Sequence, residues 1–75
     1  MRLPSKVTSY RNSIIAKFPS VLALLAKESI PPSVLYKKVK SQVEDVGEFV
    51  DILDCLYALG KIELDEERGV LRYVN

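Results

Sequence analysis

The C-terminal part of the chain constrains the fold most, because an apolar helical segment there runs into two short alternating segments. The helical pattern stops at Gly60, a residue type that adopts left-handed backbone angles at helix ends without a Cβ penalty. Residues 61–64 and 70–74 then alternate polar and apolar side chains, and residues 65–69 supply the turn between them. This order predicts a helix followed by a small β-hairpin.

The N-terminal segment reads as an extended arm over residues 1–7, followed by a helix. Thr8 and Ser9 are the candidate N-caps of this helix, which continues through Ile14, Ile15 and Phe18.

Pro19 interrupts that helical pattern, since its ring would clash with a carbonyl one turn back. The simplest interpretation makes Pro19 the first residue of a new helix, where its missing N–H costs nothing. That helix ends near Glu28, and its predicted buried face is Val21, Leu22, Leu24 and Leu25. A kinked continuous helix is the alternative.

Two further helices are predicted before the hairpin. The two prolines of residues 29–32 impose an extended connector, and a helix over residues 33–42 follows with Val34, Leu35 and Val39 facing inward. Asp45 and Glu48 form a capping box that opens the last helix, which runs to Leu59. Its predicted core stripe consists of Val46, Phe49, Val50, Leu53, Leu56 and Tyr57.

These elements predict one mainly α domain with a small β-hairpin, an α+β fold of the winged helix-turn-helix type, over residues 1–75. A chain of 75 residues is near the lower size limit for a domain held by its core alone. No apolar run approaches the ~18 residues that span a bilayer. We therefore expect a cytoplasmic protein with no membrane association, and its single cysteine fits a reducing compartment.

The charge distribution argues against the DNA binding that this fold usually implies. The net charge is +1, but residues 1–40 hold eight bases and one acid, whereas residues 41–75 hold nine acids and three bases. The last helix, which would enter the DNA groove, carries acids and no base, so it would repel a phosphate backbone. The candidate nucleic-acid contacts are Lys37, Lys38 and Lys40 of the preceding helix, although three lysines also suit a solvated helix face.

The composition disfavours catalysis. The chain has no histidine, so serine or cysteine nucleophiles lack their usual base and common zinc sites lack ligands. Cys55 reads most simply as a small hydrophobic residue, and the three glycines form no phosphate-binding loop. We expect no catalytic residues, no metal and no cofactor.

The last helix carries a second apolar strip beside its core stripe. Ile52, Cys55 and Leu59 form this strip, and with the neighbouring acids Asp51 and Glu48 they are the candidate partner interface. Either the arm or the hairpin covers the strip, or it binds another protein or a second copy of the chain. Tyr10, Tyr36 and Tyr73 are tyrosines of the amphipathic kind found at interfaces or at the rim of a core.

Several motifs resemble one known family. They are Leu3-Pro-Ser-Lys6, Lys17-Phe-Pro19, Leu35-Tyr36 and above all Leu53-Asp-Cys-Leu-Tyr-Ala-Leu-Gly-Lys-Ile-Glu-Leu64, followed by Gly69-Val-Leu71. The chain is similar over nearly its whole length to the small middle components of bacterial ABC-three component systems, which are conflict modules directed against phage and other invading DNA.

This resemblance implies a non-catalytic adaptor with a winged helix-turn-helix fold. Its implied partners are an ABC-type ATPase and an effector component from the same operon, and a homodimer is a further alternative. The competing hypothesis is a small dimeric winged-helix regulator that binds DNA.

Overall fold

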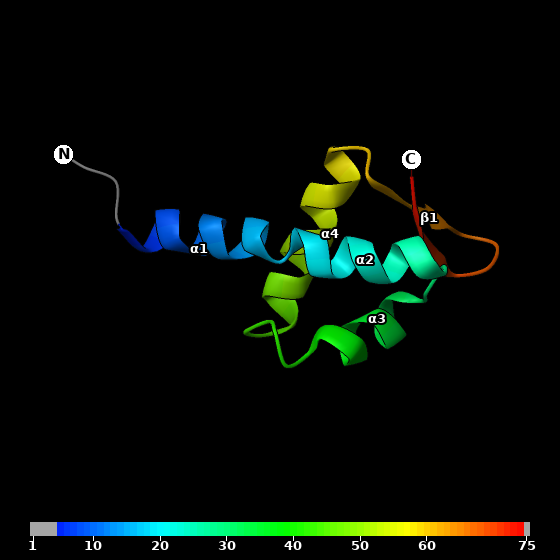
Figure 1. Cartoon of the computed structure of the whole chain (residues 1–75), viewed down its shortest axis with the longest axis horizontal. Helices are drawn as coiled ribbons and strands as arrows, with labels where there is room; N and C mark the ends of the chain where they lie inside the picture. Colours follow the sequence, from blue (N-terminus) through cyan, green and yellow to red (C-terminus); the bar gives the residue numbers. More distant parts are fainter. Residues whose placement is uncertain (1–4, 75) are drawn as a thin grey trace.

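The computed structural model describes residues 5–74, with side chains from residue 9 onward, and the chain is mainly helical with one antiparallel hairpin. This confirms the predicted α+β class. The elements in chain order are α1 (Ser5–Ala16), α2 (Phe18–Lys27), α3 (Pro32–Val39), α4 (Val46–Ala58), β1 (Ile62–Asp65) and β2 (Val70–Tyr73). Helices α1 and α2 follow the long axis of the molecule, and α4 crosses them. Helix α3 lies on the other side of α2 from the C-terminal end of α4 (Figure 1).

The start of α1 corrects the prediction of an extended arm over residues 1–7. The helix begins at Ser5, so residues 5–7 are helical, while residues 1–4 lie outside the described part of the chain. Thr8 and Ser9 consequently lie inside α1 and do not cap it. Nothing in this segment prevents a helix, because serine, lysine, valine and threonine all tolerate helix interiors at a modest cost in propensity.

The junction between α1 and α2 is a single-residue turn at Lys17. Its N–H donates to the carbonyl of Ile14 at 3.1 Å, the short spacing of a 3₁₀ turn, and its backbone angles are helical (φ −95°, ψ −6°). The new helix begins at Phe18, one residue before the predicted start, and Pro19 lies in its first turn. A proline is tolerated there because first-turn N–H groups have no intrahelical acceptor.

The hairpin forms as predicted and is also attached to the helical body. Strand β1 pairs antiparallel with β2, with Ile62 opposite Tyr73 and Leu64 opposite Leu71. Gly60 and Gly69 have positive φ angles of 73° and 69°, as the helix end and the hairpin turn require. Ile30 of the connector between α2 and α3 exchanges two backbone hydrogen bonds with Leu71, at 3.1 and 2.8 Å. The connector thus extends the edge of β2 and fixes the hairpin to the body.

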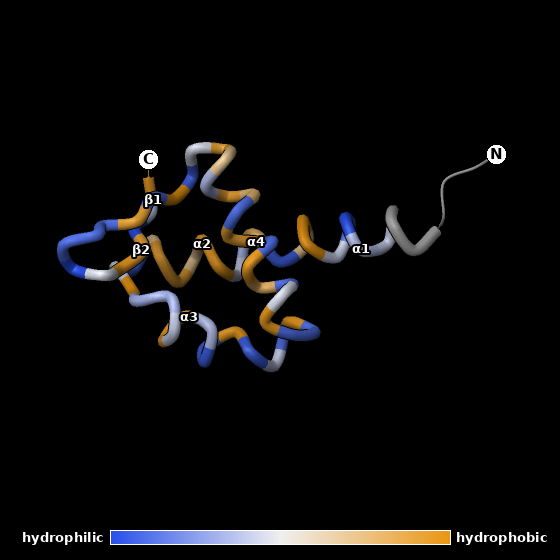
Figure 2. The backbone as a smooth tube through the Cα atoms, turned by 180° about the vertical axis from the view of Figure 1, so that it is seen from behind, coloured by the Kyte–Doolittle hydropathy of each residue, from blue (hydrophilic) through white to orange (hydrophobic). Residues whose placement is uncertain are grey.

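One apolar core joins all the elements, and hydrophobic residues follow α2 while the hairpin turn is hydrophilic (Figure 2). Val21 and Leu25 are buried and Leu22 and Leu24 pack at the core edge, which confirms the predicted face of α2. The α3 prediction is only partly correct, because the helix ends at Val39 and leaves Val34 41% exposed. The buried residues are Ile14, Val21, Leu25, Ile30, Leu35, Val39, Phe49, Ile52, Leu56, Ile62 and Leu71.

The orientation of α4 about its own axis differs from the prediction. Of the six predicted core residues only Phe49 and Leu56 are buried, and Leu53 packs partly against the core. Val46, Val50 and Tyr57 are exposed, and Ile52, which is outside the predicted stripe, is fully buried. The periodicity of apolar residues could not show which side of α4 faces the core, because α4 is apolar around most of its circumference.

Candidate protein-binding surface around the fourth helix

Asp45 and Glu48 at the start of α4 form only half of the predicted capping box. The Asp45 side chain accepts a hydrogen bond from the Glu48 N–H at 2.9 Å, as an N-cap does. The Glu48 carboxylate does not accept the second hydrogen bond of the box, from the Asp45 N–H. It accepts instead from the Glu44 N–H at 3.0 Å, from Lys17 Nζ at 2.5 Å and from Ser13 Oγ at 3.3 Å.

Glu48 is therefore a structural residue, which corrects its assignment to the partner interface. Its side chain is 2% exposed, so its charge is almost fully withdrawn from water. The hydrogen bond from Lys17 is the main reason that the pKa of Glu48 lies below its usual value of 4.5, although burial opposes this shift. The pair joins the junction between α1 and α2 to the first turn of α4.

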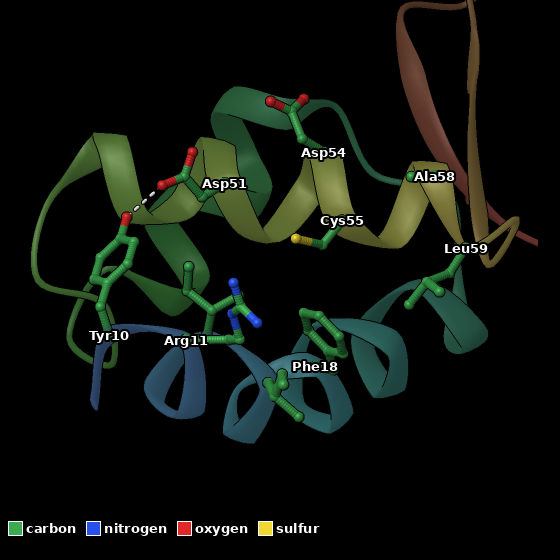
Figure 3. Close-up of a pocket in the computed structure, with 10 residues that line it drawn as sticks. Tyr10, Arg11, Phe18, Asp51, Asp54, Cys55, Ala58 and Leu59 are labelled. Atoms are coloured by element: carbon green, nitrogen blue, oxygen red, sulfur yellow. Dashed lines mark hydrogen bonds between the residues drawn. The ribbon is translucent and has the colours of Figure 1, made fainter. Parts of the chain in front are cut away.

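Tyr10 and Asp51 form a second link between α1 and α4, with Asp51 one turn after Glu48 in α4 and Tyr10 one turn before Ser13 in α1. The Tyr10 hydroxyl donates to Asp51 Oδ2, and this hydrogen bond raises the pKa of Tyr10 to about 12 (Figure 3). Desolvation and the charge of Asp51 act in the same direction, because each disfavours the phenolate. Together the two links set the separation of α1 from α4.

An open groove of about 560 Å³ lies between α1 and α4 beyond these links. Ile15 and Leu59 on its walls are 52% and 62% exposed, and the exposed thiol of Cys55 faces it from α4 (Figure 3). The groove lining is mostly apolar and consists of Tyr10, Arg11, Ile14, Ile15, Phe18, Asp51, Asp54, Cys55, Ala58 and Leu59. We call this surface the α1–α4 groove.

The groove divides the residues of the predicted partner interface. Cys55, Leu59 and Asp51 line it, whereas Ile52 is fully buried in the core and Glu48 is held by Lys17. The assignment of Ile52 and Glu48 was wrong because the rotation of α4 places Ile52 in the core and Glu48 against Lys17 and Ser13. The other wall, formed by α1, was missed in the sequence. The adjacent pair Ile14-Ile15 was the available signal, since neighbouring helical residues point about 100° apart and only one of them can lie at the centre of the core-facing side.

The remaining predicted residues lie elsewhere. Lys37, Lys38 and Lys40 are exposed at the end of α3, and none of them lines the groove. Tyr36 is half-buried and packs on Phe49 with ring centroids 5.2 Å apart, while Tyr73 is exposed on β2. Within residues 5–74 there is no group of three or more acidic or cysteine side chains placed to hold a metal ion. None of the helices in this range has the length and apolarity needed to cross a membrane.

A family comparison accounts for the chain almost end to end. The profile of the ABC-three component (ABC-3C) system Middle Component 7 family matches residues 3–71. The chain belongs to this family. No curated protein and no solved structure gave a significant match to this Middle Component 7 chain. Membership of a multi-component system implies protein partners for the Middle Component 7 chain.

Proposed function

We propose that this Middle Component 7 protein is a non-catalytic adaptor that links an ABC-type ATPase to an effector in an anti-phage conflict system. Membership of the ABC-three component family supports a role among several proteins. The observation that carries the proposal is the α1–α4 groove, because it exposes apolar side chains that no part of residues 5–74 covers. Exposed apolar surface of this kind is typical of a protein interface.

We also propose that the domain is a winged helix-turn-helix that binds proteins and not DNA. The order of helix, short bridged segment, two helices and hairpin supports this assignment, with Ile30 serving as the short third strand beside Leu71. Helix α4 then occupies the position of a recognition helix. Its charged residues are Glu48, Asp51 and Asp54, with no base, so a phosphate backbone beside this helix would be repelled.

The second candidate function is a small dimeric DNA-binding regulator. One observation favours it, namely the exposure of Lys37, Lys38 and Lys40 at the end of α3. Three lysines can neutralise phosphates, but they carry no sequence information by themselves. The adaptor is therefore the better supported function.

Coexpression with the ATPase and effector encoded in the same operon tests the adaptor proposal. The affinity-tagged full chain should retain at least one of these proteins, and Ile15→Glu or Leu59→Glu should abolish its capture. Both residues are more than half exposed, so the variants should stay folded by circular dichroism. Val34→Glu on α3 is the matched control, because Val34 is also exposed but lies outside the groove. Capture of neither component, or capture that is insensitive to both groove variants, would refute the proposal.

A further inference from the structure

A second apolar surface runs along the side of α4 that faces away from the groove. Val46, Val50 and Tyr57 are 58%, 46% and 65% exposed, and Leu53 between them packs only partly against the core. Successive members of this set are four, three and four residues apart. At about 100° per residue they form one stripe, roughly 140° around the helix axis from the groove residues Asp51, Cys55 and Ala58. We call Val46, Val50, Leu53 and Tyr57 the outer stripe.

The outer stripe continues into a cleft between α4 and the hairpin. Leu53 and Tyr57 line this cleft of about 500 Å³, together with Leu64 of β1, which is 48% exposed. The apolar surface therefore extends from the first residue of α4 to the hairpin without using any residue of α1.

The charged side chains that line this cleft are all acidic. The charged side chains that line it are Asp54, Glu63 and Glu66. Glu63 is paired across the hairpin with Arg72, which leaves Asp54 and Glu66 without an ion pair in the described part of the chain. Helix α4 adds no base. The surface is thus apolar along its centre and negatively charged at its margin.

We infer that the outer stripe is a second docking surface, and that its occupant is a basic amphipathic helix of a protein partner. The four-three-four spacing is that of a seam between two packed helices, so it fits a helix better than an extended segment. Lysine or arginine residues flanking the apolar face of the partner would pair with Asp54 and Glu66.

A second copy of the chain does not fit the outer stripe. Pairing two identical stripes about a two-fold axis would bring the carboxylates of both copies into one interface, and their repulsion disfavours association. The inference goes beyond the proposed adaptor role, because it names a second surface, which shares only Asp54 with the α1–α4 groove, and the chemistry of what binds there. An adaptor that joins two components needs two such separate surfaces.

Synthetic helical peptides test this inference with the full-length protein. The probe carries leucines at four-three spacing flanked by lysines, and two controls replace the lysines by glutamates or scramble the same residues. We expect the basic peptide to bind at least tenfold more tightly than either control by fluorescence anisotropy. In amide NMR spectra it should shift signals of Val46, Val50 and Tyr57 and leave those of Ile15 and Leu59 unchanged.

Variants of the protein then locate the contact. Tyr57→Ala and the charge reversal Glu66→Lys, neither of which lies in the groove, should each weaken binding of the basic peptide, Tyr57→Ala by at least tenfold, while Ile15→Glu in the groove should have no effect. Equal binding of the scrambled peptide, shifts confined to the groove or α3, or no binding would overturn the inference. So would a dimer in sedimentation that Tyr57→Ala dissociates. Capture of operon components through the groove does not depend on any of these results, so the two proposals can fail separately.

Discussion

At the scale of single residues, the buried carboxylate of Glu48 is the most consequential group in the molecule. It is 2% exposed and accepts hydrogen bonds from Lys17, Ser13 and the Glu44 backbone. A buried charge is tolerated only when it is paired and hydrogen-bonded, and removing one partner leaves the cost of its desolvation uncompensated. The stability of the domain should therefore depend on Lys17 more than on any exposed lysine.

We predict that Lys17→Met lowers the free energy of unfolding by roughly 3 kcal/mol, because it leaves the Glu48 carboxylate buried without its cation. Urea unfolding followed by circular dichroism measures this loss. Lys38→Met on the exposed side of α3 is the matched control and should change stability by less than about 0.5 kcal/mol. Equal effects of the two substitutions would mean that the buried pair contributes no more than a surface charge.

The same carboxylate gives the fold a defined dependence on pH. The pKa of Glu48 in the folded protein lies below its ordinary value of 4.5, so the unfolded chain binds the proton more readily. The stabilisation is complete above the ordinary pKa and is lost as the pH falls through the folded pKa. Urea unfolding between pH 7 and acidic pH should show this loss, and Glu48→Gln should have a shallower decline below pH 4.5. Parallel profiles for the two proteins would contradict the lowered pKa.

Tyr10 should give the fold a dependence on pH of the opposite direction, with stability lost at high pH. The hydrogen bond to Asp51 raises its pKa to about 12, so the folded state holds this proton more tightly than the unfolded chain does. The stabilisation is present below pH 10 and is lost as the pH rises toward 12. Absorbance titration should show that the Tyr10 phenolate forms late, and Asp51→Asn should return the pKa of Tyr10 toward 10. A titration unchanged by Asp51→Asn would show that the hydrogen bond does not control the pKa.

At the scale of elements, the sequence predicted where α4 and the hairpin begin and end better than it predicted how α4 is oriented. Asp45 and Gly60 mark the ends of the helical pattern through their local chemistry, the N-cap hydrogen bond of one and the positive φ of the other. The rotation of α4 depends on contacts with α1 and with the α1–α2 junction, which come from a distant part of the chain. The link between Lys17 and Glu48 is such a contact, and no periodicity could predict it.

The observed orientation of α4 predicts which truncations are costly. Ile52→Ala and Leu56→Ala should each cost about 2–5 kcal/mol, because both side chains are fully buried. Leu53→Ala should cost less, since Leu53 lies at the core edge. Val50→Ala should be close to neutral, because Val50 is 46% exposed and alanine favours the helix. Thermal unfolding of the four variants checks the order, and a Val50→Ala loss as large as that of Leu56→Ala would contradict this rotation of α4.

At the scale of the whole molecule, the division of charge has a functional consequence. The basic residues lie mainly in α1 to α3 and the acidic residues in α4 and the hairpin, so α4 itself offers no cation to a phosphate backbone. The groove of the candidate site is built from both halves. Its α4 wall could be predicted in part, through Cys55 and Leu59, whereas its α1 wall required the three-dimensional fold.

We predict no sequence-specific DNA binding at physiological salt. Weak binding at low salt should come from the exposed lysines of α3 and should decline steeply as salt rises, because it rests on counterion release alone. Gel-shift titrations at two salt concentrations measure this salt dependence. The double variant Lys37→Gln and Lys38→Gln should lose the weak binding at low salt. A nanomolar, sequence-dependent complex at moderate salt would instead support the DNA-binding regulator.

The exposed thiol of Cys55 makes the groove directly observable. It is the only cysteine in the chain, and it lies on the α4 wall between Asp51 and Leu59. A maleimide reagent would therefore label one position, and that position is within the surface whose occupancy matters. Protection of this thiol from alkylation in intact cells would report how much of the protein is engaged at any moment, without a tag or a substitution.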